Sequence, residues 1–75
     1  MNERREEGAR ELAEYLLAQV VRTPEELSVE LRGGSLTVSV ARRDRAIVIG
    51  TGGQNLRALE QILAEVGVTR IELRD

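Results

Sequence analysis

The spacing of apolar residues changes along the chain, and each change predicts a new element. From position 8 onward they recur every three or four residues, which is typical of an amphipathic helix whose other face carries charge. Pro24 is expected to end this helix, and Thr23 with Glu26 predicts a single turn with a side-chain cap. The apolar positions of the predicted helix are Ala9, Leu12, Ala13, Leu16, Leu17 and Val20.

The period then becomes two, which indicates strands with one apolar and one polar face. Two such runs, 27–31 and 36–40, are separated by Gly33-Gly34. Both glycines can take the positive φ that a two-residue hairpin turn requires. The pattern predicts an antiparallel hairpin that is covered on one side only. The inward positions are Leu27, Val29, Leu31, Leu36, Val38 and Val40.

A glycine loop at 50–53 separates two further helical segments. Asp44 is expected to cap a short helix that ends before Gly50. A longer helix begins at Gln54 and stops at Gly67, as helices do at a C-terminal glycine. A last strand over 68–73 follows, with Ile71 and Leu73 on one face. The apolar face of the longer helix is Leu56, Leu59, Ile62, Leu63 and Val66.

The order of these elements predicts an α+β fold, α-β-β-α-α-β, with three helices packed on one face of a three-stranded mixed sheet. Because more than a dozen residues of helical crossover join the last two strands, those strands should run parallel. The length of 75 residues allows one small domain. We expect that domain to span 9–75, with 1–8 forming a polar, frayed N-terminus.

Composition narrows the possible functions. The chain has no cysteine, histidine or lysine, so it lacks the usual nucleophiles and general bases near neutral pH. We therefore expect no enzyme, no cofactor and no metal site. Neither a transmembrane span nor a signal peptide is evident, so a cytoplasmic protein without membrane partners is expected.

Charge also limits the kind of partner. All eleven basic residues are arginine, yet the formal net charge is −2. A non-specific duplex binder is usually strongly basic, because its affinity scales with the phosphates it neutralises. Any nucleic-acid binding must therefore come from a local site.

Three kinds of explanation compete for the glycine loop, and nucleotide-binding motifs are the first kind. A dinucleotide-binding fingerprint needs a preceding strand, and a phosphate-binding P-loop needs a lysine that this chain lacks. The loop could also be a tight turn between two helices, with no ligand. Its flanks favour a third explanation, because Ile49-Gly50-Thr51-Gly52-Gly53 is followed by Leu56 in Ile-Gly-x-x-Gly-x-x-Leu spacing.

This segment resembles the Ile-Gly-x-x-Gly signature of KH domains. The element order, with a helix and a strand ahead of the core, is similar to the type II KH arrangement of bacterial proteins. In length and in its Pro24-Glu25-Glu26-Leu27 entry to the first strand, the chain resembles the small KhpA-type single-KH proteins. The run 53–57 also resembles a KH segment of NusA. The similarity covers roughly residues 9–74.

The resemblance implies binding of single-stranded RNA, or single-stranded DNA, by a loop that clamps about four nucleotides. Backbone amides at the start of the following helix would hold phosphate, and Ile49 with Leu56 would form an apolar floor. Arg42, Arg43 and Arg45 could surround the site. The implied binding residues are Ile49, Gly50, Thr51, Gly52, Gly53, Gln54, Asn55, Leu56, Arg57 and Arg45.

The sequence departs from the KH pattern in the loop and at Ile47, a position where KhpA-type sequences often carry a lysine, and this keeps a second function open. The middle residues of the loop, Thr51 and Gly52, replace the lysine or arginine common there, so we expect weak, salt-sensitive and sequence-tolerant binding. The alternative is a protein-interaction module that forms a homodimer or joins a second KH-containing RNA-binding protein. Ile47, Leu16 and Leu17 are candidates for that contact surface.

Overall fold

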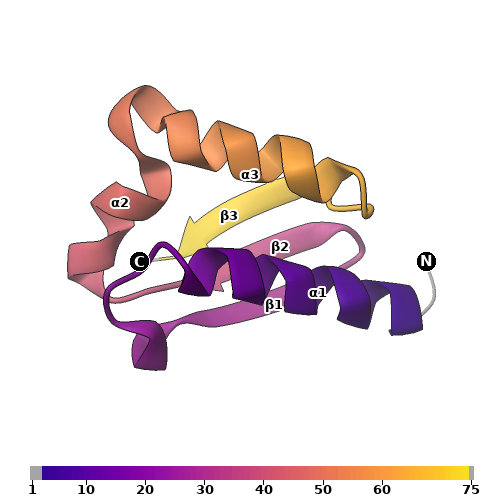
Figure 1. Cartoon of the computed structure of the whole chain (residues 1–75). Helices are drawn as coiled ribbons and strands as arrows, with labels where there is room; N and C mark the ends of the chain where they lie inside the picture. Colours follow the sequence, from indigo (N-terminus) through magenta and orange to yellow (C-terminus); the bar gives the residue numbers. More distant parts are fainter. Residues whose placement is uncertain (1–2, 75) are drawn as a thin grey trace.

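The computed structural model describes residues 3–74. Three helices and three strands make up the fold, and short 3-10 turns connect them (Figure 1). In chain order they are α1 Glu3–Ala18, η1 Pro24–Glu26, β1 Ser28–Arg32, β2 Ser35–Ser39, η2 Arg42–Asp44, α2 Arg45–Ile49, η3 Thr51–Gly53, α3 Gln54–Ala64 and β3 Arg70–Arg74.

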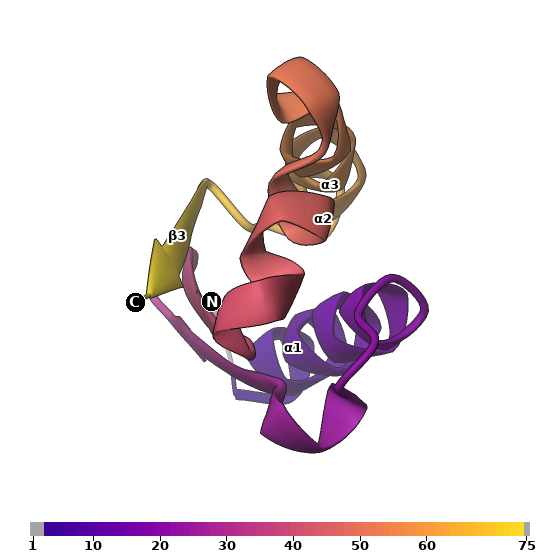
Figure 2. The same cartoon turned by 90° about the vertical axis from the view of Figure 1, so that its left-hand side faces the viewer.

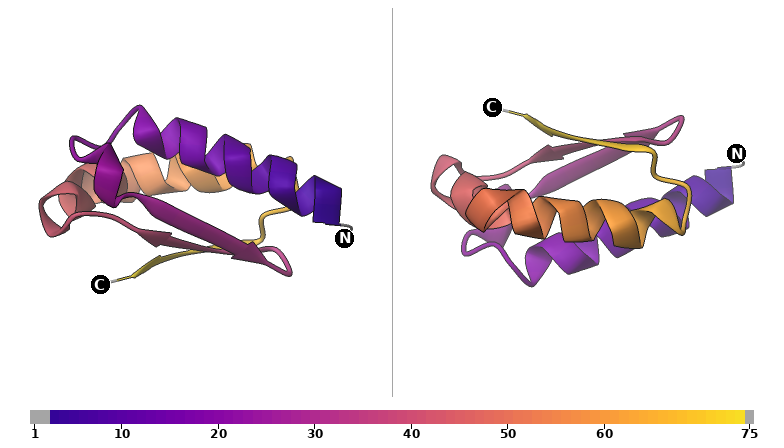
Figure 3. Two further views of the ribbon diagram at one scale, coloured as in Figure 1. Left: turned by 90° about the horizontal axis from the view of Figure 1, so that it is seen from below. Right: turned by 90° about the horizontal axis from the view of Figure 1, so that it is seen from above.

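The sheet has the strand order β1-β2-β3. β1 pairs antiparallel with β2, and Arg32 opposes Ser35 across a two-residue turn. β2 pairs parallel with β3, with Leu36 opposite Ile71 and Val38 opposite Leu73. Figure 3 shows all three helices on one side of this sheet, with the other side uncovered. The predicted α+β architecture and the parallel last strand are therefore confirmed.

Aliphatic side chains fill the layer between the helices and the sheet. Small residues on α1, Ala9 and Ala13, are 2% and 0% exposed and let the helix lie close to its neighbours. Because side chains in a core pack at crystal-like density, this interface leaves little room for larger groups. The largest buried apolar side chains are Leu17, Leu36, Leu63, Val38 and Val48.

The predicted glycine turns have the expected geometry. Gly33 and Gly34 have φ values of +54° and +86°. Gly67, at φ +95°, ends α3 in a Schellman arrangement, because its N–H donates to Ala64 O and the Val68 N–H donates to Leu63 O. Both turns therefore follow from glycine's access to the left-handed region.

The first helix differs from its prediction at both ends. It begins at Glu3 instead of near Gly8, and acids in its first turns suit the positive end of the helix dipole. It ends at Ala18, before Pro24 is reached. Residues 1–2 lie outside the described range, and a frayed segment over 1–8 stays a prediction, as does the domain boundary there.

Ile62 was placed wrongly on the buried face of α3. It is 47% exposed, whereas Leu59 and Leu63 are 9% and 0% exposed. Because Leu59 and Leu63 lie four residues apart along one line of the helix, they face the sheet, and Ile62 points away. Among residues 3–74, no helix is both long enough and apolar enough to span a bilayer.

Candidate functional site

The glycine loop forms a tight turn between α2 and α3. Figure 2 shows α2 in front of α3, with both helices on the same side of the sheet as α1. Gly50, Gly52 and Gly53 have φ values of +77°, +60° and +78°, so three of the four loop residues adopt the left-handed conformations that glycine favours. Thr51 and Gly52 at the tip are exposed. The loop thus projects backbone, with few side-chain atoms, toward solvent.

Asn55 fixes the shape of the loop from within. Its Nδ2 donates a hydrogen bond to Ile47 O at 2.7 Å, which joins the start of α3 to α2. Gly50 packs against the same residue, because a Cβ there would lie 2.8 Å from both Asn55 N and Asn55 Cγ. A side chain at position 50 is therefore excluded both by φ and by contact.

The loop presents backbone donors that the protein itself leaves unused. Gly53 N–H donates to Gly50 O, and Gln54 N–H donates to Thr51 O. The N–H groups of Thr51 and Gly52 have no backbone partner within residues 3–74. Unpaired N–H groups at the start of a helix can bind an anion, and the dipole of the eleven-residue α3 adds positive potential there.

Arg57 adds a cation to the loop from one turn into α3. Its Nη1 would lie 3.3 Å from a Cβ at Gly53, so the side chain folds back over the end of the loop. Arg57 has no ion pair with an acid in the described part of the chain. The guanidinium is exposed and free to meet an incoming phosphate.

Arg10 on α1 shows the opposite behaviour. Its guanidinium lies 2.9 Å from Glu7 Oε1 and 3.3 Å from Glu14 Oε1. Hydrogen bonding to Glu7 raises the pKa of Arg10 above its ordinary value, burial acts against this, and Glu14 adds to the rise. The charge of Arg10 is thus compensated within its own helix.

The arginine that begins α2 connects that helix to the last strand. Arg45 Nη1 donates to Arg74 O at 2.7 Å, so the start of α2 and the end of β3 lie side by side. Arg45 is half-buried and makes further contact beyond this bond. It holds one end of the loop-bearing segment against the sheet.

Half-buried apolar residues lie between α3 and the edge strand β3. Leu56, Ile71 and Leu73 line one small cavity of about 10 Å³ together with core residues. A space of this size holds about one water molecule at most, so it is part of the core and no ligand pocket. Ile49, the other predicted floor residue, is also half-buried and directly precedes the loop.

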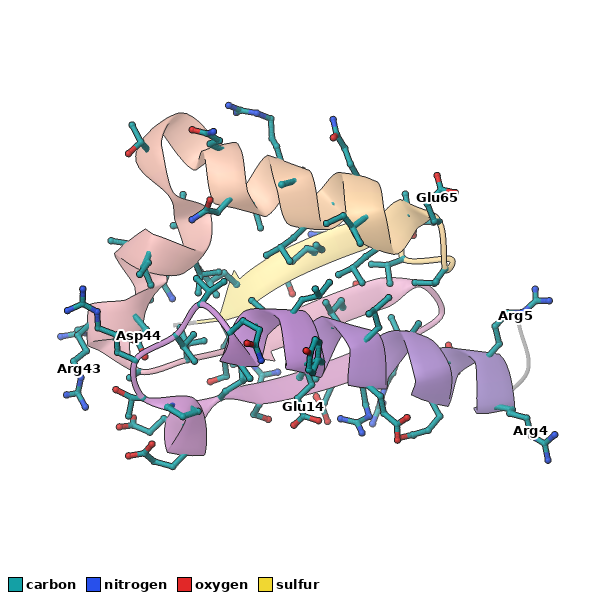
Figure 4. All side chains as sticks on the ribbon, viewed as in Figure 1. Arg4, Arg5, Glu14, Arg43, Asp44 and Glu65 are labelled. Carbon is teal, nitrogen blue, oxygen red and sulfur yellow. The ribbon has the colours of Figure 1, made fainter. Side chains whose placement is uncertain are left out.

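A buried carboxylate ties the loop-bearing segment to the chain between α1 and β1. Asp44 is 1% exposed, and its Oδ2 accepts a hydrogen bond from the Thr23 N–H at 2.9 Å. Arg43 Nε donates to Thr23 Oγ1 at 3.0 Å. Figure 4 shows Arg43 and Asp44 where this connection approaches η2.

The caps predicted for these two residues are therefore wrong. Neither Thr23 nor Asp44 makes a side-chain hydrogen bond to its own helical turn. The two residues meet across 21 positions of sequence, and this tertiary contact replaces the local caps. A short polar residue before a turn is the usual signal of a cap, and the same signal fits a long-range acceptor.

The structure brings most of the predicted site residues together around the loop. Arg45 is the exception, because it contacts the end of β3. Ile71 and Leu73 were predicted on one face of the last strand but not among the site residues, although the parallel crossover places them beside α3. The structural use of the Asn55 amide was not predicted either. Among residues 3–74, no group of three or more histidine, cysteine or acidic residues could hold a metal ion.

The comparisons with known proteins agree with this geometry. The family model for the KhpA/KhpB KH domain matches residues 10–70, which include the loop and all but the ends of the fold. Searches of curated proteins and of solved structures returned no match. KH domains are nucleic-acid-binding modules and not an enzyme family. The chain belongs to the KhpA/KhpB KH-domain family.

Proposed function

We propose that this protein binds single-stranded nucleic acid, RNA in the first place, through the backbone of the Gly50–Gly53 loop, and that it does so in the cytoplasm as part of RNA metabolism. The observation that carries the proposal is the pair of unused N–H groups at Thr51 and Gly52, in the η3 turn that directly precedes α3. These donors suit a phosphate oxygen in position and in charge.

The arrangement implies how a strand is held. A phosphate accepts hydrogen bonds from the loop, and the Arg57 guanidinium, folded over Gly53, contributes the cation that the loop side chains lack. Bases would rest on the half-buried Ile49 and Leu56 without aromatic stacking. Since none of these contacts reads a base edge with charged or bidentate groups, binding should be weak and tolerant of sequence.

The distribution of charge supports the same site. Four of the eleven arginines but only one of the thirteen acids lie in 41–59, and that acid, Asp44, is buried. The segment that carries the loop is therefore positive on a protein that is negative overall. A local positive surface attracts phosphate even when the net charge does not.

The test is a pair of variants that differ only in charge. Replacing Thr51→Asp together with Gly52→Asp places two carboxylates at the phosphate position, and Thr51→Asn with Gly52→Asn is the matched neutral control. Fluorescence polarisation with labelled 10-nucleotide RNA at low salt should show at least a roughly hundredfold loss of affinity for the Asp pair. The Asn pair should stay within a few fold of the unmodified protein.

Two results would contradict the proposal. If the unmodified protein shows no detectable binding at low salt, the protein does not bind RNA and the proposal is wrong. Equal affinities of the Asp and Asn pairs would show that the strand binds somewhere other than the loop. Parallel titrations with DNA of the same sequence measure whether the ribose hydroxyl contributes.

A second candidate function is self-association, and one surface favours it. An open groove of about 290 Å³ runs between α1 and α3, and its lining is almost wholly apolar. Ile62, 47% exposed, projects beside it. Because one face carries both a groove and a projecting side chain, two copies related by a two-fold axis could fill each other's groove. The lining residues include Leu16, Val20, Ala58 and Ile62.

This surface keeps Leu16 from the one expected from the sequence but not Leu17 or Ile47. Leu17 is 1% exposed and belongs to the core, and Ile47 is half-buried and packs against it. Sedimentation at high concentration should show a dimer that Ile62→Glu dissociates and Gln61→Glu, an exposed neighbour, leaves intact. A monomer for the unmodified protein would exclude the homodimer; the same groove could then be tested with a second KH-containing RNA-binding protein.

A further inference from the structure

Three arginines gather at the corner of the molecule where the chain enters the loop-bearing segment. Arg42 and Arg43 lie in η2, immediately before α2, and both are exposed. The hydrogen bonds of Thr23 to Asp44 and Arg43 bring its neighbour Arg22, also exposed, to the same place. We call Arg22, Arg42 and Arg43 the basic corner.

The charge of this corner is not cancelled by acids bound to it. Among residues 3–74, no acid lies within ion-pair distance of these three guanidinium groups. Asp44, which adjoins Arg43 in sequence, is buried and directs its carboxylate inward to the Thr23 N–H. Glu25 and Glu26 follow in η1 and are exposed, but neither is paired with the corner.

We propose that the basic corner is a second phosphate-binding surface, which holds the same nucleic-acid strand after it leaves the loop. The inference rests on the proposed function of the loop and extends it. It assigns the protein a ligand longer than the roughly four nucleotides that a KH loop clamps. Single strands of eight nucleotides or more are then the preferred class of ligand.

The distance between the two surfaces suits one continuous strand. α2 has five residues, and at about 1.5 Å per residue it spans roughly 7 to 8 Å. The corner lies at one end of this short helix and the loop at the other, so a few nucleotides bridge them. Arg45, at the start of α2, keeps the intervening surface arginine-rich up to the end of β3.

The chemistry of the corner favours a phosphate backbone over other anions. Guanidinium groups bind phosphate oxygens in bidentate fashion, and several of them in a row match the repeated charge of a strand. Arg43 Nε is engaged by Thr23 Oγ1, which orients the guanidinium and leaves its other nitrogens outward. No aromatic residue is present there to stack on a base, so the contact should not depend on sequence.

The experiment compares strand lengths and two variants of equal charge. Labelled poly-U RNAs of four and ten nucleotides are titrated in 50 mM salt against the unmodified protein, against Arg42→Gln with Arg43→Gln, and against Arg4→Gln with Arg5→Gln. Each variant removes two positive charges, and Figure 4 shows Arg43 and the pair Arg4 and Arg5 at opposite ends of the molecule. Circular dichroism and urea unfolding verify that each variant is folded.

We expect the unmodified protein to bind the ten-nucleotide strand roughly tenfold more tightly than the four-nucleotide strand. The variant Arg42→Gln with Arg43→Gln should lose most of that gain. The slope of log K against log salt should also become shallower by about 1.4, because each lost phosphate contact contributes about 0.7. The variant Arg4→Gln with Arg5→Gln should keep both the gain in affinity for the longer strand and the salt slope of the unmodified protein. Affinity for the four-nucleotide strand should be nearly equal in all three proteins.

The outcomes separate the corner from the loop. If the four-nucleotide strand binds and the longer strand binds no better, or if both variants lose affinity equally, the corner is not a binding surface and the proposed function stands. If neither strand binds the unmodified protein, the proposed function fails and this inference fails with it.

Discussion

The hairpin turn at Gly33-Gly34 and the loop at 50–53 both need glycines with positive φ, but their surroundings are very different. In the hairpin turn, Gly33 N–H donates to Glu6 Oε2 on α1, and Gly34 O accepts from the N–H groups of Thr69 and Arg70. In the loop between α2 and α3, the N–H groups of Thr51 and Gly52 have no backbone partner within residues 3–74. Internal contacts use the polar backbone of the first turn, and the second presents its donors to solvent.

This difference shows what a glycine-rich segment can be used for. Both turns need positive φ, so conformational freedom explains the glycines in each. Only the loop leaves hydrogen-bonding groups unsatisfied next to a helix start, and there the Arg57 side chain folds back over the backbone of Gly53. Unpaired backbone groups are therefore a better sign of a binding site than glycine content. Four substitutions test this comparison.

The largest effect is expected from Gly34→Ala in the hairpin turn. The new Cβ would lie 3.0 Å from Thr69 Oγ1 and 3.2 Å from Gly67 O, at φ +86°. Left-handed backbone and crowding together should lower the free energy of unfolding by about 2–3 kcal/mol, measured by urea denaturation. RNA affinity per folded molecule should not change. A loss of RNA affinity in the fully folded variant would show that the hairpin turn also takes part in binding, and would contradict the comparison of the two turns.

Gly50→Ala should have an effect of similar size on stability, and it should also lower the affinity for RNA. Its Cβ would lie 2.8 Å from Asn55 N, a backbone atom that cannot move aside without disturbing α3. We expect about 2–3 kcal/mol of destabilisation, together with a roughly tenfold loss of RNA affinity because the loop is displaced. Unchanged RNA affinity would mean that the loop geometry does not matter for binding.

Arg57→Ala should act on binding alone. Removing the guanidinium should weaken RNA binding roughly fivefold at low salt and reduce the salt slope by about 0.7. The free energy of unfolding should change by less than about 0.5 kcal/mol, because the side chain is exposed. Arg32→Ala removes the same charge beside the hairpin turn and serves as the control. Equal effects of the two substitutions would show that Arg57 acts only through the net charge of the protein and does not contact the strand.

Gly52→Asn should have the smallest effect. A Cβ at this position meets no atom within 4 Å, and asparagine tolerates the φ of +60° better than most residues. Stability should fall by no more than about 0.5 kcal/mol, and RNA affinity should stay within about threefold. A large loss of affinity would indicate that the strand approaches position 52 more closely than backbone hydrogen bonding requires.

Much of the fold could be predicted from local patterns. The change from helical to alternating periodicity locates both hairpin strands, and the crossover length gives the parallel β3. Gly67 ends α3 through the expected capping bonds. These features depend on short-range sterics and hydrogen bonds, which a few neighbouring residues determine.

Apart from the ends of α1, the errors concern contacts between distant residues. Thr23 and Asp44 resemble caps because the residues next to them begin turns, yet they bond to each other across the sequence. Ile62 fits the apolar period of α3, and only the position of α1 decides that it is exposed. For the site, the loop could be located from its motif, but the Asn55 bond to Ile47 and the inward carboxylate of Asp44 depend on the folded arrangement.

The parallel pairing of β2 with β3 has a consequence for the order in which the protein acquires its function. The loop lies between these two strands in sequence, and Arg45 bonds to the last residue of β3. A chain still emerging from the ribosome can therefore form α1 and the hairpin early, but the loop is not held in place until residues 70–74 have emerged. Non-local pairing of this kind forms slowly. The loop, and with it the proposed binding of RNA, is thus completed only at a late step of folding.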